Sequence, residues 1–240
     1  MKPGRLILLP VSLADTPWQS FLPAEAHARA VSLRHFVVET AKTARAQLKR
    51  LEHPLPLSEL DIRELPLKAG AGELDALLAP LHTGHDLGLL SDAGCPAVAD
   101  PGSRLVARAH AQGLAVQPLV GPSSLLLALM GSGLNGQSFA FSGYLPVAEH
   151  ERDQAIRTLE AESARLARTQ IFIETPYRNT RLFDALLRQC RPDSLLCVAR
   201  DLTGVDEYIS TRRIADWRRS PAPDLQRRPA LFLLLAGSNL

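Results

Sequence analysis

Short apolar runs alternate with amphipathic segments along the chain, which is the pattern of an α/β protein. In the first half, apolar runs predict strands at residues 5–10, 35–39, 86–92 and 114–120, and Glu64 and Leu65 fall in a further strand. The segments between them predict helices over residues 40–51, 71–82 and 103–113, the first with Thr40 as its N-cap. The run LGLL at 87–90 has no polar face, so we expect helices on both sides of this strand.

The rhythm of the pattern changes near residue 119. The segment GPSSLLLALMGSG predicts a helix over residues 121–133. After it, strands are expected at 138–145, 169–175, 194–202, 207–214 and 229–237, with helices at 150–167 and 179–190. We therefore expect two α/β lobes, residues 1–118 and 119–240.

Composition adds little to this picture of a globular chain. The 27 Lys and Arg residues nearly balance 25 acidic residues, so the net charge of +2 does not indicate a nucleic-acid surface. Six arginines between Arg212 and Arg228 form one basic stretch, which is either a solvated face or a phosphate-binding patch.

The three cysteines have neither disulfide nor metal-site spacing, and His82 and His85 lack a third ligand nearby in the sequence. We therefore expect free thiols and no metal site. The apolar run before Pro10 is too short for a signal peptide, and no segment approaches the length of a membrane span. These features predict a cytoplasmic protein that does not enter a membrane.

Three turns at predicted strand ends contain the residues most suited to binding a ligand, namely 8–10, 89–96 and 119–124. None has the glycine spacing of a dinucleotide-binding turn or a P-loop, which argues against nicotinamide cofactors and nucleoside triphosphates. An Asp in a glycine turn with two hydroxyls at a helix start suits a zwitterionic ligand that has hydroxyls and an amino-acid tail. Asp92 and Asp100 are equally explained as turn-formers that bind their own backbone.

The stretch LGLLSDAGCPAVADPGSRLV closely resembles the Ser-Asp-Ala-Gly-x-Pro…Asp-Pro-Gly motif of the small-subunit ribosomal RNA (cytidine 2′-O) methyltransferase family. That family belongs to the tetrapyrrole methylase superfamily. The resemblance continues through VGPSSLLLALMGSGL, SFAFSGYLP, IFIETPYRNTRLFDAL and VARDLT, and spans at least residues 86–203. The chain departs from the family pattern at PVSLADTP and VETAKTARAQL, and it is shorter than typical members at its C-terminus.

The resemblance implies two α/β lobes of the tetrapyrrole methylase type, with a cleft between them that binds S-adenosylmethionine. The positions that it implies for cofactor binding are Pro10, Leu90, Ser91, Asp92, Cys95, Ser123, Ser124, Glu174, Leu202, Pro229 and Ala230. Ser123 and Ser124 are also explained as helix caps, and Glu174 as the ion-pair partner of Arg178 or Arg181.

The expected activity is methyl transfer from S-adenosylmethionine to RNA, at a ribose 2′-hydroxyl of small-subunit ribosomal RNA. A ribose hydroxyl is a poor nucleophile that benefits from a base, and Asp201 and Glu174 are the candidates. Arg178, Arg181 and Arg200 are candidates for binding phosphates or carboxylates of the substrate. The resemblance also implies a homodimer.

Two alternatives stay open from the sequence. A tetrapyrrole (porphyrin or corrin) C-methyltransferase shares the expected fold, although an aromatic content of 5% argues mildly against a site for a large flat ring. A non-catalytic cofactor-binding or RNA-binding module is the third interpretation, because the N-terminal blocks depart from the family pattern.

Overall fold

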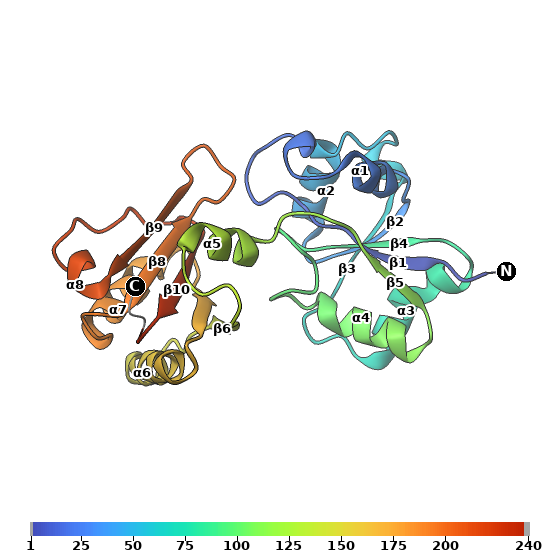
Figure 1. Cartoon of the computed structure of the whole chain (residues 1–240). Helices are drawn as coiled ribbons and strands as arrows, with labels where there is room; N and C mark the ends of the chain where they lie inside the picture. The colour runs from blue at the N-terminus through green and yellow to red at the C-terminus, as the bar shows by residue number, and fades with distance from the viewer. Residues whose placement is uncertain (1, 238–240) are drawn as a thin grey trace. The chain divides into compact units, whose positions relative to one another are not determined.

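A computed structural model describes residues 2–237 of the chain. The chain forms two compact units, Met1–Ser123 and Ser124–Leu240, each described here by itself (Figure 1). The prediction ended the first lobe at residue 118, whereas residues 119–123 pack with the first unit. The backbone N–H of Leu119 donates to the carbonyl of Leu8 at 2.9 Å, and this bond extends the first sheet past the predicted boundary.

The first unit is a five-stranded sheet in the order β3-β2-β4-β1-β5, in which every neighbouring pair is parallel. Its strands are β1 (Arg5–Leu8), β2 (His35–Val38), β3 (Asp61–Glu64), β4 (Leu87–Leu90) and β5 (Ala115–Pro118). Its helices are α1 (Ala24–Val31), α2 (Ala41–Arg50), α3 (Ala71–His82) and α4 (Gly102–Ala111), with short 3-10 turns at Trp18–Ser20 and Leu57–Glu59.

Helices cover both faces of this sheet, with α1 and α2 on one side and α3 and α4 on the other (Figure 1). Successive strand residues point to opposite faces, so Ile7 packs with α1 and α2 while Leu6 packs with α3 and α4. All four residues of β4 are buried, as the apolar run at 87–90 predicts. The central strand is therefore covered on both faces, whereas the edge strands β3 and β5 are partly exposed.

Helix α1 is absent from the sequence-based expectation. Its buried residues are Ala26 and Ala30, so the face that packs on the sheet has no large apolar side chain to mark it. The helix follows Pro23, a residue that ends the preceding segment and favours a helix start. The missed helix thus reflects the small volume of its core-facing side chains.

The second unit is a mixed sheet in the order β6-β7-β10-β8-β9. Its strands are β6 (Phe139–Tyr144), β7 (Thr169–Ile173), β8 (Leu195–Arg200), β9 (Tyr208–Arg213) and β10 (Ala230–Leu235). β6 and β7 are parallel, whereas β10 runs antiparallel to both of its neighbours and β9 runs antiparallel to β8. The helices are α5 (Ser124–Ser132), α6 (Glu149–Leu166), α7 (Asn179–Gln189) and α8 (Ile214–Trp217).

Two apolar clusters sandwich this second sheet. Phe172 and Phe232 pack against α6, α7 and α8, while Ile171 and Leu233 pack on the opposite face against α5. Every residue of β10 is buried, which explains its uniformly apolar sequence. Among residues 2–237, no helix has the length and apolar character needed to cross a membrane.

Candidate functional site

The carboxyl ends of parallel strands lie along one edge of a sheet, and the three predicted turns meet at this edge in the first unit. The N–H of Val11 donates to the carbonyl of Gly94 at 2.9 Å, which places the turn after β1 beside the turn after β4. The hydrogen bond from the N–H of Leu119 to the carbonyl of Leu8 places the turn after β5 beside the turn after β1. The three turns therefore form one continuous surface of backbone.

Gly121 allows two of these turns to touch. A Cβ atom at Gly121 would lie 2.3 Å from the Cβ of Pro10, so no larger residue fits without moving the backbone. The thiol of Cys95 donates to the carbonyl of Pro122 at 3.2 Å and connects the turn after β4 to the same place. Burial raises the pKa of the Cys95 thiol, which keeps it protonated as a donor rather than a nucleophile.

Asp92 has the most unusual environment at this edge. Its N–H donates to Oε2 of Glu39 at 3.1 Å, and the hydroxyl of Thr40 donates to its Oδ2 at 3.0 Å. Its other carboxylate oxygen, Oδ1, is buried and has no hydrogen-bond partner in the part of the chain that the structure describes. A buried acceptor without a partner is costly, and such atoms in native proteins mark a place for a water, an ion or a ligand.

Thr40 occupies the N-cap position of α2, as predicted, but its side chain makes no capping bond. Its hydroxyl donates to Asp92 instead. The N–H of Ala41, at the first position of α2, is satisfied by Oε1 of Glu64 from the end of β3 at 2.7 Å. The start of α2 therefore receives a side-chain acceptor from another strand, and Thr40 holds Asp92.

Asp100, in contrast, is a turn-former. Its carboxylate accepts from the N–H of Ala97 at 2.9 Å and from that of Gly102 at 2.6 Å. Ala97 and Ala99 have positive φ angles of 67° and 62°, a conformation that costs non-glycine residues about 1 kcal/mol or more each. Asp100 therefore stabilises the conformation of a strained loop. The sequence left open that Asp92 and Asp100 are turn-formers, and this interpretation applies to Asp100.

The remaining predicted residues of this edge are partly hidden. The side chain of Leu90 lies in the core, and Ser91 is buried with its hydroxyl donating to the carbonyl of Ala93 at 3.1 Å. Ser123 ends the first unit and Ser124 is the first residue of α5. Their roles as cofactor contacts or helix caps stay predictions.

Glu174, directly after β7, is held by the protein itself. Its Oε1 accepts from the N–H of Thr175 and from Nη2 of Arg178, each at 2.6 Å. Its partner is thus Arg178, one of the two that the sequence allowed. The other, Arg181, is exposed in the first turn of α7.

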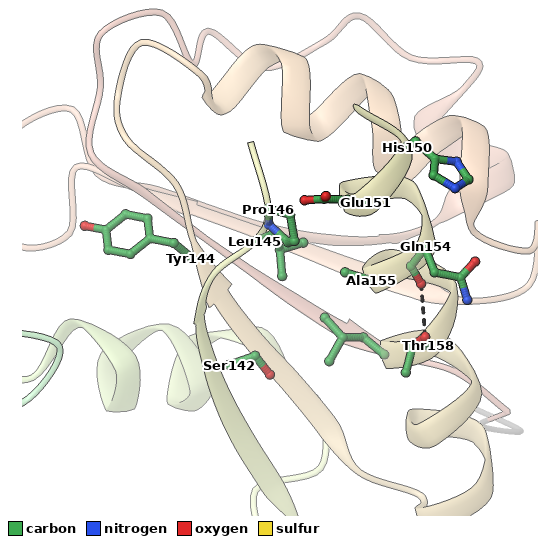
Figure 2. Close-up of a pocket in the computed structure, with 10 residues that line it drawn as sticks. Ser142, Tyr144, Leu145, Pro146, His150, Glu151, Gln154, Ala155 and Thr158 are labelled. Carbon is green, nitrogen blue, oxygen red and sulfur yellow. Dashed lines mark hydrogen bonds between the residues drawn. The ribbon is translucent and has the colours of Figure 1, made fainter. Parts of the chain in front are cut away.

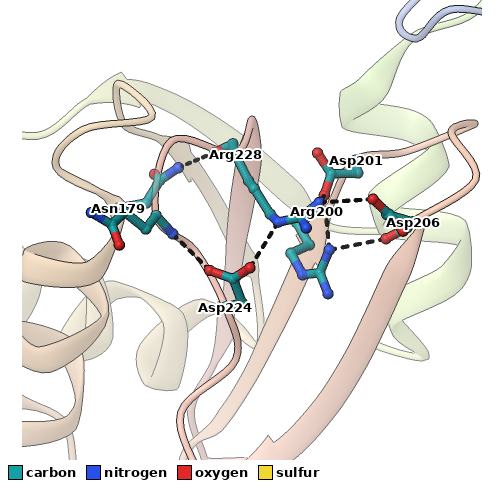
Figure 3. A network of polar contacts seen from close by, with 7 residues as sticks. Asn179, Arg200, Asp201, Asp206, Asp224 and Arg228 are labelled. Atoms are coloured by element: carbon teal, nitrogen blue, oxygen red, sulfur yellow. Dashed lines mark hydrogen bonds and ion pairs between the residues drawn. The ribbon is translucent and has the colours of Figure 1, made fainter.

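Asp201, directly after β8, belongs to a network of ion pairs (Figure 3). Its Oδ2 accepts from Arg200 at 2.8 Å and from Arg228 at 2.7 Å. Arg228 also donates to Asp206 at 3.2 Å and to Asp224 at 3.0 Å. The hydrogen bonds that Arg228 donates to these carboxylates raise the pKa of its guanidinium, so this cation is permanently charged.

The network joins two segments that are distant in sequence. The N–H of Asp201 donates to the carbonyl of Pro229 at 3.0 Å, and Ala230 pairs with Arg200 in the sheet. The side chain of Leu202 is buried in the cluster under α5. The structure thus brings together four of the predicted second-unit residues, Asp201, Leu202, Pro229 and Ala230.

A separate groove of about 540 Å³ lies on the second unit between the end of β6 and the start of α6 (Figure 2). Tyr144 and Pro146 border it on one side, and Glu151, Gln154 and Thr158 on the other. The groove is lined by none of the predicted site residues in the described part of the chain. The SFAFSGYLP block therefore ends at a surface hollow and not at the ion-pair network.

Sequence reasoning missed Glu39 and Thr40 as site residues. Both directly follow β2, and the parallel-edge rule that selected Asp92 also applies to them. Within residues 2–237, no group of three or more His, Cys, Asp or Glu side chains is arranged to hold a metal ion. All three cysteines are free thiols.

Several curated proteins named "Ribosomal RNA small subunit methyltransferase I" are similar to this chain. The protein of Mesorhizobium japonicum is 38% identical over 143 residues, which cover 58% of this chain and 47% of that protein. The protein of Vibrio cholerae is 34% identical over 159 residues, covering 66% of this chain and 54% of that protein. The chain spans about half the length of the curated relatives that it matches.

The fold is also that of a solved methyltransferase. The crystal structure of CobJ aligns with a TM-score of 0.62 at 18% identity, and the alignment covers 97% of this chain and 94% of CobJ. No protein-family model matches the chain. The relatives confirm the resemblance seen in the sequence, and the CobJ likeness confirms the predicted fold class.

Proposed function

We propose that the chain is an S-adenosylmethionine-dependent methyltransferase that acts on RNA, at a ribose 2′-hydroxyl of small-subunit ribosomal RNA. The names of the relatives support the reaction and the substrate class. The observation that carries the proposal is the unpaired Oδ1 of Asp92, at a sheet edge where ligands of α/β proteins bind. The likeness to CobJ concerns the fold and does not favour a tetrapyrrole substrate.

The residues at this edge suit the methyl donor. Oδ1 of Asp92 is an anionic acceptor, which matches the hydroxyl and ammonium donors of S-adenosylmethionine. Thr40 and Glu39 fix the position of Asp92, and Gly121 lets the turns after β1 and β5 approach closely. The proposed donor contacts in the first unit are Pro10, Leu90, Ser91, Asp92, Cys95 and Ser123. In the second unit they are Ser124, Glu174, Leu202, Pro229 and Ala230.

The bound donor supplies an electrophilic methyl group on a sulfonium, and the chain supplies orientation and exclusion of water. Glu174 and Asp201 are the proposed bases for the ribose hydroxyl. Both carboxylates accept from arginines, Arg178 and Arg228. Either carboxylate must therefore be released by its arginine before it accepts a proton. We propose that phosphates of the RNA draw the arginines away, and that Arg178, Arg181 and Arg200 are the residues that contact these phosphates.

The test of activity is incubation of total RNA and of ribosomal particles with methyl-labelled donor, followed by mapping of the labelled nucleotide. We expect label at one 2′-hydroxyl of the small-subunit RNA. Label in another class of molecule, or no label with all RNA preparations, would contradict the proposed substrate.

The test of the site is donor binding measured by calorimetry. Asp92→Ala removes the unpaired acceptor, and we expect about tenfold weaker binding, as for a lost hydrogen bond to a charged group. Asp15→Ala is the control, because Asp15 is an exposed aspartate of the same unit that pairs with Arg50. Equal donor affinity of both variants would show that the donor binds elsewhere.

Two further statements extend the sequence analysis, the first from the resemblance and the second from the composition of the chain. We propose that the protein forms homodimers and acts in the cytoplasm. Sedimentation of the purified chain tests the first statement, and fractionation of cells tests the second.

A further inference from the structure

We propose that Tyr177 and Arg227 form a platform on which one unpaired base of the RNA substrate stacks, with Arg181 binding a neighbouring phosphate. The inference rests on the proposed function, because it assigns a position to the RNA. It concerns Tyr177, in the loop between β7 and α7, and Arg227; the proposed chemistry uses Glu174 and Arg178 of that loop but neither Tyr177 nor Arg227.

Tyr177 is held outward by a rigid turn. The N–H of Arg178 donates to the carbonyl of Thr175 at 2.9 Å, which closes a four-residue turn with Pro176 in the position that proline favours. The ion pair between Glu174 and Arg178 braces the same turn. Tyr177 is nevertheless 78% exposed, so the turn presents an aromatic ring that contributes little to the core.

Arg227 is brought to this ring from a distant part of the chain. Its N–H donates to the carbonyl of Pro176 at 3.1 Å, and its guanidinium carbon lies 5.9 Å from the centroid of the Tyr177 ring. Asn179 strengthens the junction, because its amide donates to the carbonyl of Arg228 at 2.7 Å (Figure 3). Two loops are therefore tied together where the tyrosine and the arginine meet.

The backbone of Arg227 supports a functional origin for this arrangement. Its φ angle is 58°, in the left-handed region that non-glycine residues rarely adopt. Such a conformation persists only when the surroundings enforce it, and it occurs preferentially at functional sites. Here the strained residue is the one that lies over the exposed ring.

The structure gives a role to three of the six arginines in the basic stretch between Arg212 and Arg228. Arg212 packs over Trp217, Arg218 donates to the carbonyls of Leu187 and Cys190, and Arg228 pairs with three carboxylates. These three arginines have structural roles. In the part of the chain that the structure describes, Arg227 and Arg181 form no ion pair, so their charges are available to a ligand.

The chemistry of the patch favours single-stranded RNA. Unpaired bases stack on tyrosine rings and on guanidinium planes, and unneutralised arginines attract phosphate. A guanidinium over one side of the ring leaves the other side for a base and strengthens the site through a cation–π contact. An acidic protein surface would also meet the arginines, but it would not need an open ring beside them.

The experiment measures the affinity of the full-length chain for unmodified small-subunit ribosomal RNA made by transcription in vitro. Tyr177→Ala removes the ring, and we expect about tenfold weaker binding. Tyr177→Phe keeps the stacking surface and should bind within about twofold of the wild type. Thermal unfolding and donor affinity should be unchanged in both variants, because the ring is exposed.

The charge contribution is tested with two arginines of the same helix. Arg181→Gln should lower the slope of log affinity against log salt by about 0.7, the value for one phosphate contact on a single strand. Arg188→Gln removes the same charge from a residue that pairs with Glu149, and it should leave the slope unchanged.

The outcomes separate the platform from the proposed function. If Tyr177→Ala binds RNA like the wild type while folding and donor binding are intact, the platform is wrong and the methyltransferase proposal stands. If the wild type binds RNA through Tyr177 but neither binds nor uses the donor, the platform stands and the proposed function fails. Wild-type protein that does not bind this RNA, or binds ribosomal particles equally well after ribonuclease treatment, overturns the platform.

Discussion

Asp92 and Asp201 both follow the buried strands of a sheet, yet their surroundings are opposite. Asp92 lies at an edge of parallel strands, with a threonine hydroxyl on one oxygen and no partner for the other among residues 2–237. Asp201 lies after β8 and is bound by the guanidinium groups of Arg200 and Arg228. One carboxylate is left open, and the other is neutralised.

This difference distinguishes a carboxylate that can bind a ligand from one that holds the loops of the protein in place. An unpaired buried acceptor raises the free energy of the ligand-free protein, so a donor that reaches it is bound more tightly. A carboxylate that already accepts from two arginines has no such deficit and instead fixes the loops that carry them. The strand ends of the first unit are therefore the better candidate for ligand binding, and the network of the second unit is the better candidate for holding its loops.

The largest effect should come from the glycine that shapes the first edge. Gly121→Ala would place a Cβ 2.3 Å from that of Pro10, so one of the two turns must move. We expect a loss of about 1–3 kcal/mol in the free energy of unfolding, the usual cost of overpacking. Donor affinity should also fall, because the turns after β1 and β5 are displaced. Denaturant unfolding and calorimetry measure the two effects.

Gly72→Ala is the matched control for this substitution. Gly72 lies in α3 of the same unit, and a Cβ there would meet no atom within 4 Å. Alanine is favoured over glycine inside a helix, so stability should rise by about 0.5–1 kcal/mol. If Gly121→Ala were as stable as Gly72→Ala, the close approach of the turns would not be needed for the fold.

The next effect tests the comparison directly, through the same substitution at both aspartates. Asp201→Asn weakens its bonds to Arg200 and Arg228, and we expect a loss of about 1 kcal/mol in unfolding free energy with little change in donor affinity. Asp92→Asn keeps the shape but removes the charge, and we expect weaker donor binding with stability unchanged within about 0.5 kcal/mol. Asparagine suits the positive φ of 50° at Asp201, so backbone strain does not confuse the result.

An exchange of the two results would reverse the assignment. Loss of donor affinity in Asp201→Asn, with a destabilised Asp92→Asn, would place the ligand at the network and the support at the first edge. Calorimetry and denaturant unfolding on the same preparations distinguish the two cases.

Much of the fold followed from hydrophobic periodicity alone. The strands and the long helices are where the apolar runs and amphipathic segments predict them, because burial dictates these patterns. α1 was missed because alanines form its buried face. The units divide after Ser123, five residues beyond the predicted end of the first lobe, and the bond from Leu119 to Leu8 is one contact in this stretch that no side-chain pattern reports.

That the strand-end turns meet at one edge was predictable, whereas the contacts among their side chains were not. Strand-end turns and the family resemblance selected Asp92, Pro10 and Cys95. That the hydroxyl of Thr40 binds Asp92 and makes no capping bond at α2 depends on side-chain conformation, as does the bond from the N–H of Ala41 to Glu64. Which of Arg178 and Arg181 pairs with Glu174 likewise depends on side-chain conformation, which a sequence with two equally suitable arginines does not specify.

The smallest expected effect is the pH dependence of stability that Asp100 in the first unit and Asp224 in the second unit contribute. Burial raises the pKa of Asp100 above its ordinary value of 3.8, and the charge of Glu39 adds to this effect against the backbone bonds from Gly102 and Ala97. The folded protein therefore binds this proton more readily than the unfolded chain, and the contribution of Asp100 to stability grows as the pH falls toward 3.8 and is complete below it. The hydrogen bond from Arg228 lowers the pKa of Asp224, so the contribution of Asp224 to stability is present above 3.8 and is lost as the pH falls through the lowered value.

Titration of the carboxyl carbons by NMR should give a midpoint above 3.8 for Asp100 and below it for Asp224. The variants Asp100→Asn and Asp224→Asn assign the signals. A midpoint for Asp100 at or below that of Asp224 would contradict the contrast between a partly buried carboxylate of the first unit and an ion-paired network of the second.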